Sequence, residues 1–83
     1  RLLPDPPMEE RMAVMVEHIR LMASYKGDAV AFREARKHCG WYMTGMRGAA
    51  ALRRQAGTIG SLEDVRALAR AALEQAAQAG ETR

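Results

Sequence analysis

Apolar residues recur at helical spacing along nearly the whole chain, and glycines interrupt this pattern at a few points. No stretch shows the period of two that a half-buried strand requires. With 83 residues the chain can form one small domain at most. The pattern therefore predicts an all-α fold, a small four-helix bundle.

The first half of the chain contains two predicted helices. The first begins at Asp5 or Pro7 and stops at Gly27, and Asp28 caps the second, which extends to about Met43. One face of the first helix carries Met8, Met12, Met15, Val16, Ile19, Met22 and Ala23. The apolar face of the second consists of Ala31, Phe32, Ala35, Cys39, Tyr42 and Met43.

The second half contains a short helix and a long one. Gly45 and Gly48 bracket a turn, and the short helix covers residues 49–56 before Gly57. Ser61, followed three residues later by Asp64, resembles a capping box for a last helix that stops at Gly80. That helix is expected to bury Leu62, Val65, Leu68, Ala69, Ala72, Leu73 and Ala76.

The ends of the chain differ from its middle. Residues 1–7 contain three prolines and are predicted to be an interdomain linker. Residues 8–80 form the helical domain, and residues 81–83 a disordered tail. Because position 1 is Arg, we expect the chain to be a segment of a longer protein.

The first predicted helix has a second apolar stripe. Val14, Leu21 and Tyr25 lie on the side opposite the main apolar face. A helix with two apolar sides is central in its bundle or faces a partner, and we hypothesise that this stripe docks against a missing domain.

Positive charge is concentrated in the middle of the chain. The net charge is +3, but residues 33–54 contain six basic residues and one acid, a balance of +5. On the second helix Arg33, Arg36, Lys37 and Gly40 cover one continuous arc, with Trp41 at its edge. A glycine within a helix costs about 1 kcal/mol relative to Ala, and one gain would be the close approach of a phosphate backbone.

The same arc has simpler explanations. Opposite an apolar face, it is also what a solvated helix surface looks like, and Gly40 would equally permit tight packing between helices. Trp41 and Tyr42 are more often core or interface residues than platforms on which a base stacks.

Several kinds of site are not expected. The sequence shows no phosphate-binding loop, nucleophile–base pair or metal cluster, and His18 and His38 lack the spacing of metal ligands. The single Cys39 rules out an internal disulfide and suits a reducing cytosol, so we expect a cytoplasmic protein. No apolar run approaches the roughly 20 residues that span a bilayer.

Residues 36–42 carry the string Arg-Lys-His-x-x-Trp-Tyr, which resembles the C-terminal region of bacterial tRNA-dihydrouridine synthases, particularly their B branch. His18-x-x-Leu21, Tyr25-x-Gly27, the turn at residues 45–49 and Arg53 are also similar to that family, and the resemblance covers residues 12–73. Thr44 and Gly57 depart from it, since the family often has Lys and Asn there.

The resemblance implies a division of labour between two domains. The parent enzyme would carry FMN and a catalytic cysteine on an N-terminal TIM barrel, and would reduce a D-loop uridine with hydride that passes from NADPH through the flavin. This chain would be the helical tRNA-binding domain that positions the uridine. Its expected partners are tRNA and the barrel, and it would hold no cofactor, metal or catalytic residue, so Cys39 is not the catalytic cysteine.

The expected phosphate contacts are Arg33, Arg36 and Lys37. Arg47, Arg53 and Arg54 would extend this patch, and Lys26, His38 and Trp41 are secondary candidates.

Two other functions stay open at this point. The first is a regulatory bundle that binds another protein. The second is a DNA-binding domain in which residues 57–61 form the turn of a helix-turn-helix, although Arg66 and Arg70 have acidic neighbours and make the last helix a poor recognition helix.

Overall fold

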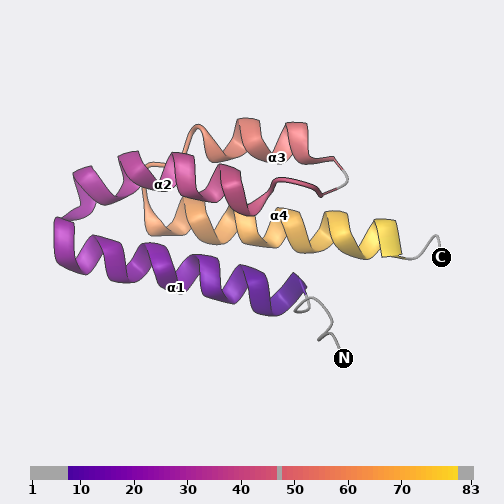
Figure 1. Cartoon of the computed structure of the whole chain (residues 1–83), viewed down its shortest axis with the longest axis horizontal. Helices are drawn as coiled ribbons and strands as arrows, with labels where there is room; N and C mark the ends of the chain where they lie inside the picture. The colour runs from indigo at the N-terminus through magenta and orange to yellow at the C-terminus, as the bar shows by residue number, and fades with distance from the viewer. Residues whose placement is uncertain (1–7, 47, 81–83) are drawn as a thin grey trace, which may run out of the picture.

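The computed structural model describes residues 8–46 and 48–80, which form four helices that run alternately in opposite directions (Figure 1). α1 spans Met8–Lys26, α2 Asp28–Tyr42, α3 Ala49–Ala56 and α4 Leu62–Gly80. No strand occurs in this part of the chain. The prediction of an all-α fold, a small four-helix bundle, is confirmed.

Each helix packs against two others. α1 lies against α4 and α2, and α3 lies against α2 and α4. α1 and α3 therefore occupy opposite edges of the molecule, whose extents are 42 × 31 × 17 Å (Figure 1). One side of α2 stays uncovered between these two neighbours.

Gly27 alone separates α1 from α2. Its φ of 84° reverses the chain, and its carbonyl oxygen accepts the first hydrogen bond of α2 from the amide of Ala31 at 3.0 Å. The prediction that Asp28 caps α2 is wrong, because Gly27 is the N-cap and no side chain caps the helix. Asp28 is already the first helical residue, where the helix dipole stabilises its negative charge.

The start of α4 has a capping arrangement close to the expected one. The amide of Asp64 donates to Ser61 Oγ at 3.1 Å. The Asp64 carboxylate accepts from the amide of Gly60 at 2.9 Å, one residue before the position that a capping box uses.

The core consists of side chains from all four helices and the α3–α4 loop. Most of the predicted apolar faces of α1 and α2 are buried as expected. The buried residues are Met12, Met15, Ile19, Met22, Ala31, Phe32, Ala35, Cys39, Met43, Leu52, Ala56, Ile59, Val65, Leu68, Ala69 and Ala72.

Seven residues of the predicted apolar faces are half-buried instead: Met8, Val16, Ala23, Tyr42, Leu62, Leu73 and Ala76. α4 has 19 residues and α3 only 8, so the later turns of α4 lack a full set of neighbours. Tyr42 lies at the boundary between α1 and α2, where its ring reaches the surface. None of the helices in the described ranges is long and apolar enough to cross a membrane.

Candidate nucleic-acid interface

The uncovered side of α2 carries Arg33, Lys37, Gly40 and Trp41, which we call the basic face. Arg33 and Lys37 are exposed, and 63% of the Trp41 surface is accessible to solvent. A Cβ atom at Gly40 would have no other atom within 4 Å, leaving aside its two chain neighbours and the backbone of its own helix. Tight packing between helices of this bundle therefore does not explain Gly40, and the space beside it is open to a partner.

Arg36 lies at the edge of this side and contacts the protein itself. Its Nε donates a hydrogen bond of 2.9 Å to the carbonyl oxygen of Ile59 in the α3–α4 loop. Arg36 was predicted to be a primary phosphate contact, but it also holds this loop against α2. The remaining N–H groups of its guanidinium are available to other partners.

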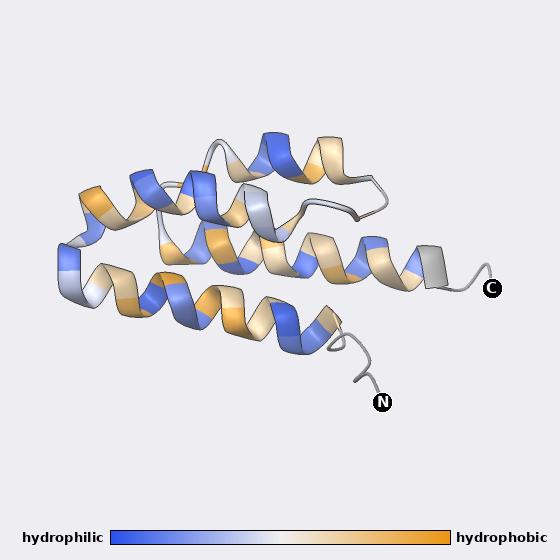
Figure 2. Cartoon of the chain, viewed as in Figure 1, coloured by the Kyte–Doolittle hydropathy of each residue, from blue (hydrophilic) through white to orange (hydrophobic). Residues whose placement is uncertain are grey.

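The predicted extension of the patch falls on α3. Arg53 and Arg54 are exposed in the last turn of this helix, which packs beside α2. In Figure 2 both α2 and α3 carry strongly hydrophilic residues. Arg47 lies outside the described residues.

Lys26, a secondary candidate, is held by an acid. Its Nζ lies 2.8 Å from Glu34 Oε1, and this hydrogen bond is the main reason why the pKa of Glu34 is lowered. The positive charge of Lys26 is therefore largely balanced within the chain.

His38 and Trp41 belong to a continuous row of four rings between α2 and α1. The ring centroids of Trp41 and His38 are 5.3 Å apart, those of His38 and His18 5.1 Å, and those of His18 and Tyr42 6.3 Å. All three contacts are edge-to-face. Lys37 Nζ lies 5.4 Å from the centre of the Trp41 ring, within the range of a cation–π contact.

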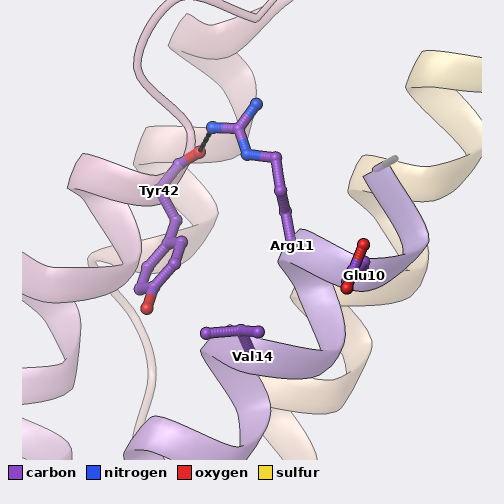
Figure 3. A pocket seen from close by; sticks show the side chains of 4 residues that line it. All are labelled: Glu10, Arg11, Val14 and Tyr42. Atoms are coloured by element: carbon purple, nitrogen blue, oxygen red, sulfur yellow. Dashed lines mark hydrogen bonds between the residues drawn. The ribbon is translucent and has the colours of Figure 1, made fainter. Parts of the chain in front are cut away.

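The row of rings lines a groove of about 370 Å³ together with Arg11, a residue of α1. The Arg11 guanidinium donates to the main-chain carbonyl of Tyr42 at 3.4 Å, across the space between the two helices (Figure 3). This carbonyl lies at the C-terminus of α2, where the helix dipole stabilises a cation. The groove thus combines exposed aromatic surface with a positive charge.

Two titratable groups of α2 have shifted pKa values. Partial burial, followed by electrostatic repulsion from His18 and Lys37, lowers the pKa of His38. Burial alone raises the pKa of Cys39 to about 11. Cys39 is thus a neutral, buried thiol of the core at physiological pH.

A separate apolar surface covers the outer side of α1. Val14 is 53% exposed, Leu21 41% and Tyr25 84%. Val14 and Leu21 line a groove of about 470 Å³ with Ala13, Glu10, Glu17 and His18. The second apolar stripe of this helix is therefore uncovered in the chain itself.

The sequence did not predict a role for Arg11, nor the contact between His18 and Tyr42. The Tyr42 hydroxyl and His18 Nδ1 are 3.5 Å apart, and these residues are 24 positions apart in the chain. The one signal for His18 and Tyr42 was that both lie in the short sequence strings that resemble the dihydrouridine synthase family. Within the described ranges, no three His, Cys, Asp or Glu residues are placed to hold a metal ion.

The fold and the site define a small all-α bundle with a cationic and aromatic surface on its second helix. The sequence matches the family model described as Dihydrouridine synthase (Dus) over residues 1–79. The chain therefore belongs to the dihydrouridine synthase family.

Relatives in several bacteria agree with this assignment. The chain is 34% identical over 65 residues to the tRNA-dihydrouridine synthase B of Pseudomonas putida, which covers 78% of this chain and 18% of that protein. It is 39% identical over 59 residues to a probable tRNA-dihydrouridine synthase 1 of Synechocystis, with 71% and 16% covered. A probable enzyme of this kind in Rhizobium leguminosarum is 49% identical over 39 residues, 47% of this chain and 12% of that protein.

The chain thus spans less than a fifth of the length of these relatives. No solved structure matches it. The predicted resemblance of the chain to this family is confirmed, and proteins of its B branch are among the relatives.

Proposed function

We propose that this chain is the tRNA-binding domain of a flavin-dependent tRNA-dihydrouridine synthase, and that it positions a D-loop uridine for reduction. The observation that carries the proposal is the basic face of α2, where Arg33 and Lys37 are exposed and the space beside Gly40 is open. Phosphate contacts from Lys and Arg supply most of the affinity in such complexes. The family membership indicates that the nucleic acid is tRNA.

The chemistry would take place in another domain of a cytoplasmic enzyme. FMN and NADPH would serve a TIM barrel that carries the catalytic cysteine. The described grooves are open hollows on the surface of α1 and α2, whereas cofactor sites enclose most of the ligand. These residues do not fit a flavin, so no step of the reduction is assigned to them.

The barrel is also the partner that we propose for the outer side of α1. Exposed apolar residues rimmed by charge mark interaction surfaces, and Val14 and Leu21 are flanked by Glu10 and Glu17. Because of this surface, binding to another protein is the second candidate function of the chain. A helix-turn-helix is not favoured, because Arg66 and Arg70 both lie within 4 Å of Glu63 on α4.

The proposal is tested by titrating the chain with unmodified tRNA and with duplex DNA of similar length. Arg33→Ala/Lys37→Ala should lose most of the affinity for tRNA. Arg66→Ala/Arg70→Ala removes the same charge from α4 and serves as the matched control. Arg36 is left intact in both variants, because it also bonds the α3–α4 loop.

Tight binding of tRNA that only the α2 variant weakens would support the proposal. Equal loss in both variants would mean that net charge alone drives binding, and a preference for duplex DNA would favour the helix-turn-helix reading. If tRNA does not bind even at low salt, the proposed role of this surface is wrong for the chain by itself.

A further inference from the structure

We propose that the groove between α1 and α2, lined by Arg11, His18, His38, Trp41 and Tyr42, binds a single unpaired nucleotide, with its base on Trp41 and its phosphate toward the histidine pair. The inference deepens the proposed function and rests on it, because it names the part of an RNA that this surface would take. The basic face would contact the phosphate backbone, and the groove would take one base that is not paired.

Trp41 is the base platform of this site. It is the one tryptophan of the chain, and 63% of its surface lies in solvent although Lys37 and His38 both contact it. Those contacts hold the indole in place without covering it. A held, exposed indole is what a stacked base requires, and such stacking tolerates any base because each has a π-face.

The opposite wall of the groove supplies donors for an anion. Arg11 reaches from α1 to the end of α2 and keeps further guanidinium N–H groups beyond the one that contacts Tyr42. His18 and His38 stand edge-to-face with centroids 5.1 Å apart, so a second positive charge on this pair would be unfavourable without an anion. A phosphate beside the rings would remove that penalty.

The charges around His38 determine how binding should depend on pH. Partial burial, His18, Lys37 and Lys26 lower its pKa, and Glu34 opposes them; Arg11 of α1 lines the same groove. His38 is therefore neutral at pH 7, and a bound phosphate would raise its pKa. Binding then takes up a proton, so the affinity should rise as the pH is lowered through the range in which the bound histidine becomes charged.

The groove also excludes a base in the interior of a duplex. Stacking on Trp41 requires one face of the base to be free, and a base within a duplex has both faces covered by its neighbours. The ligand is thus a loop, a bulge or a single strand.

The test is a titration of the chain with a short single-stranded oligouridylate that has no terminal phosphate, followed through the emission of Trp41. Stacking should quench this emission. With a labelled oligonucleotide, Trp41→Leu should weaken binding by about fivefold or more, the lower end of what one stacked base contributes. His38→Gln should bind at pH 7 but lose the increase in affinity at lower pH.

Two controls keep the test sharp. Gln78→Ala changes an exposed residue of α4, which contributes no side chain to this groove, and should bind like the parent chain. The same oligonucleotide annealed to its complement should leave the Trp41 emission unchanged. Circular dichroism of each variant verifies that the bundle is folded.

The possible outcomes separate this inference from the proposed function. If tRNA binds through Arg33 and Lys37 but Trp41→Leu binds tRNA and oligouridylate as well as the parent does, the groove site is overturned and the proposed function stands. If the single strand quenches Trp41 while intact tRNA does not bind, the groove site stands and the proposed function fails. Quenching by the duplex equal to that by the single strand would also overturn the inference.

Discussion

Gly48 and Gly40 show how differently one residue type can act in this chain. Gly48 begins α3 with a φ of 74°, in the left-handed region, and a Cβ atom there would displace the Gln75 side chain of α4. Gly40 lies inside α2 with open space around it. The first glycine is needed for the fold, whereas the second weakens its helix and leaves a surface bare.

The pair gives opposite predictions for stability. Gly48→Ala should lower the free energy of unfolding by about 1–2 kcal/mol, the cost of a left-handed conformation for a residue with a Cβ. Gly40→Ala should raise it by up to about 1 kcal/mol, because alanine has the higher helix propensity. Thermal unfolding followed by circular dichroism measures both changes.

The same Gly40→Ala variant tests the surface. If a phosphate approaches the helix closely at this position, the more stable variant should bind tRNA more weakly than the parent chain. Destabilisation by Gly40→Ala would contradict the open space, and unchanged binding would mean that Gly40 does not serve the close approach of RNA.

At the scale of the helices, α1 has apolar residues on two sides, of which one is buried in the core and the other is exposed to solvent. Ile19 is completely buried against the rest of the bundle, whereas Leu21, two residues later, is 41% exposed on the outer side. The two positions therefore separate the contribution of the core from that of the uncovered stripe.

Leu21→Glu should leave the isolated chain as helical as before and change the free energy of unfolding by less than about 0.5 kcal/mol, as for most surface substitutions. Ile19→Ala, the matched control, should cost about 2–5 kcal/mol because it empties part of the core. Chemical denaturation of the two variants provides the comparison. Loss of helicity in Leu21→Glu would place the stripe inside the bundle and remove it as a candidate surface for the barrel.

The helices could be predicted from the sequence because their signals are local. Apolar spacing and the glycines at 27, 45 and 48 gave all four helices, with the third at the same bounds as in the structure. The cap of α2 was missed, since a one-residue connection leaves Asp28 no position before the helix. The burial of Ile59 was also missed, because it depends on how the α3–α4 loop packs against the rest of the bundle.

The site was less predictable than the helices, because part of it depends on contacts between residues that are far apart in the chain. The arc of Arg33, Lys37 and Gly40 follows from the turn of one helix, so periodicity was enough to find it. The hydrogen bond from Arg36 to Ile59 and the groove between Arg11 and Trp41 join residues that are far apart in the chain. Such contacts depend on tertiary packing, which periodicity does not describe.

For the whole molecule, the distribution of charge matters more than its sum. The net charge is only +3, and α4 offsets Arg66 and Arg70 with Glu63. Among the described residues, no ion pair engages Arg33 or Lys37 on α2, or Arg53 or Arg54 on α3. Because α2 packs against α3, these cations should act on a bound RNA as one surface.

The salt dependence of tRNA binding tests this view of the molecule. Each phosphate contact contributes roughly 0.7–0.9 to the slope of log affinity against log salt concentration, so four cations predict a slope of about −3 to −4. Arg33→Ala/Lys37→Ala and Arg53→Ala/Arg54→Ala should each reduce its magnitude by about 1.5, and Arg66→Ala/Arg70→Ala should leave it unchanged. If only the α2 pair alters the slope, the RNA contacts α2 and not α3. If the α4 pair alters it as much as the others, no face of the bundle is preferred, and the surface assigned to α2 and α3 is wrong.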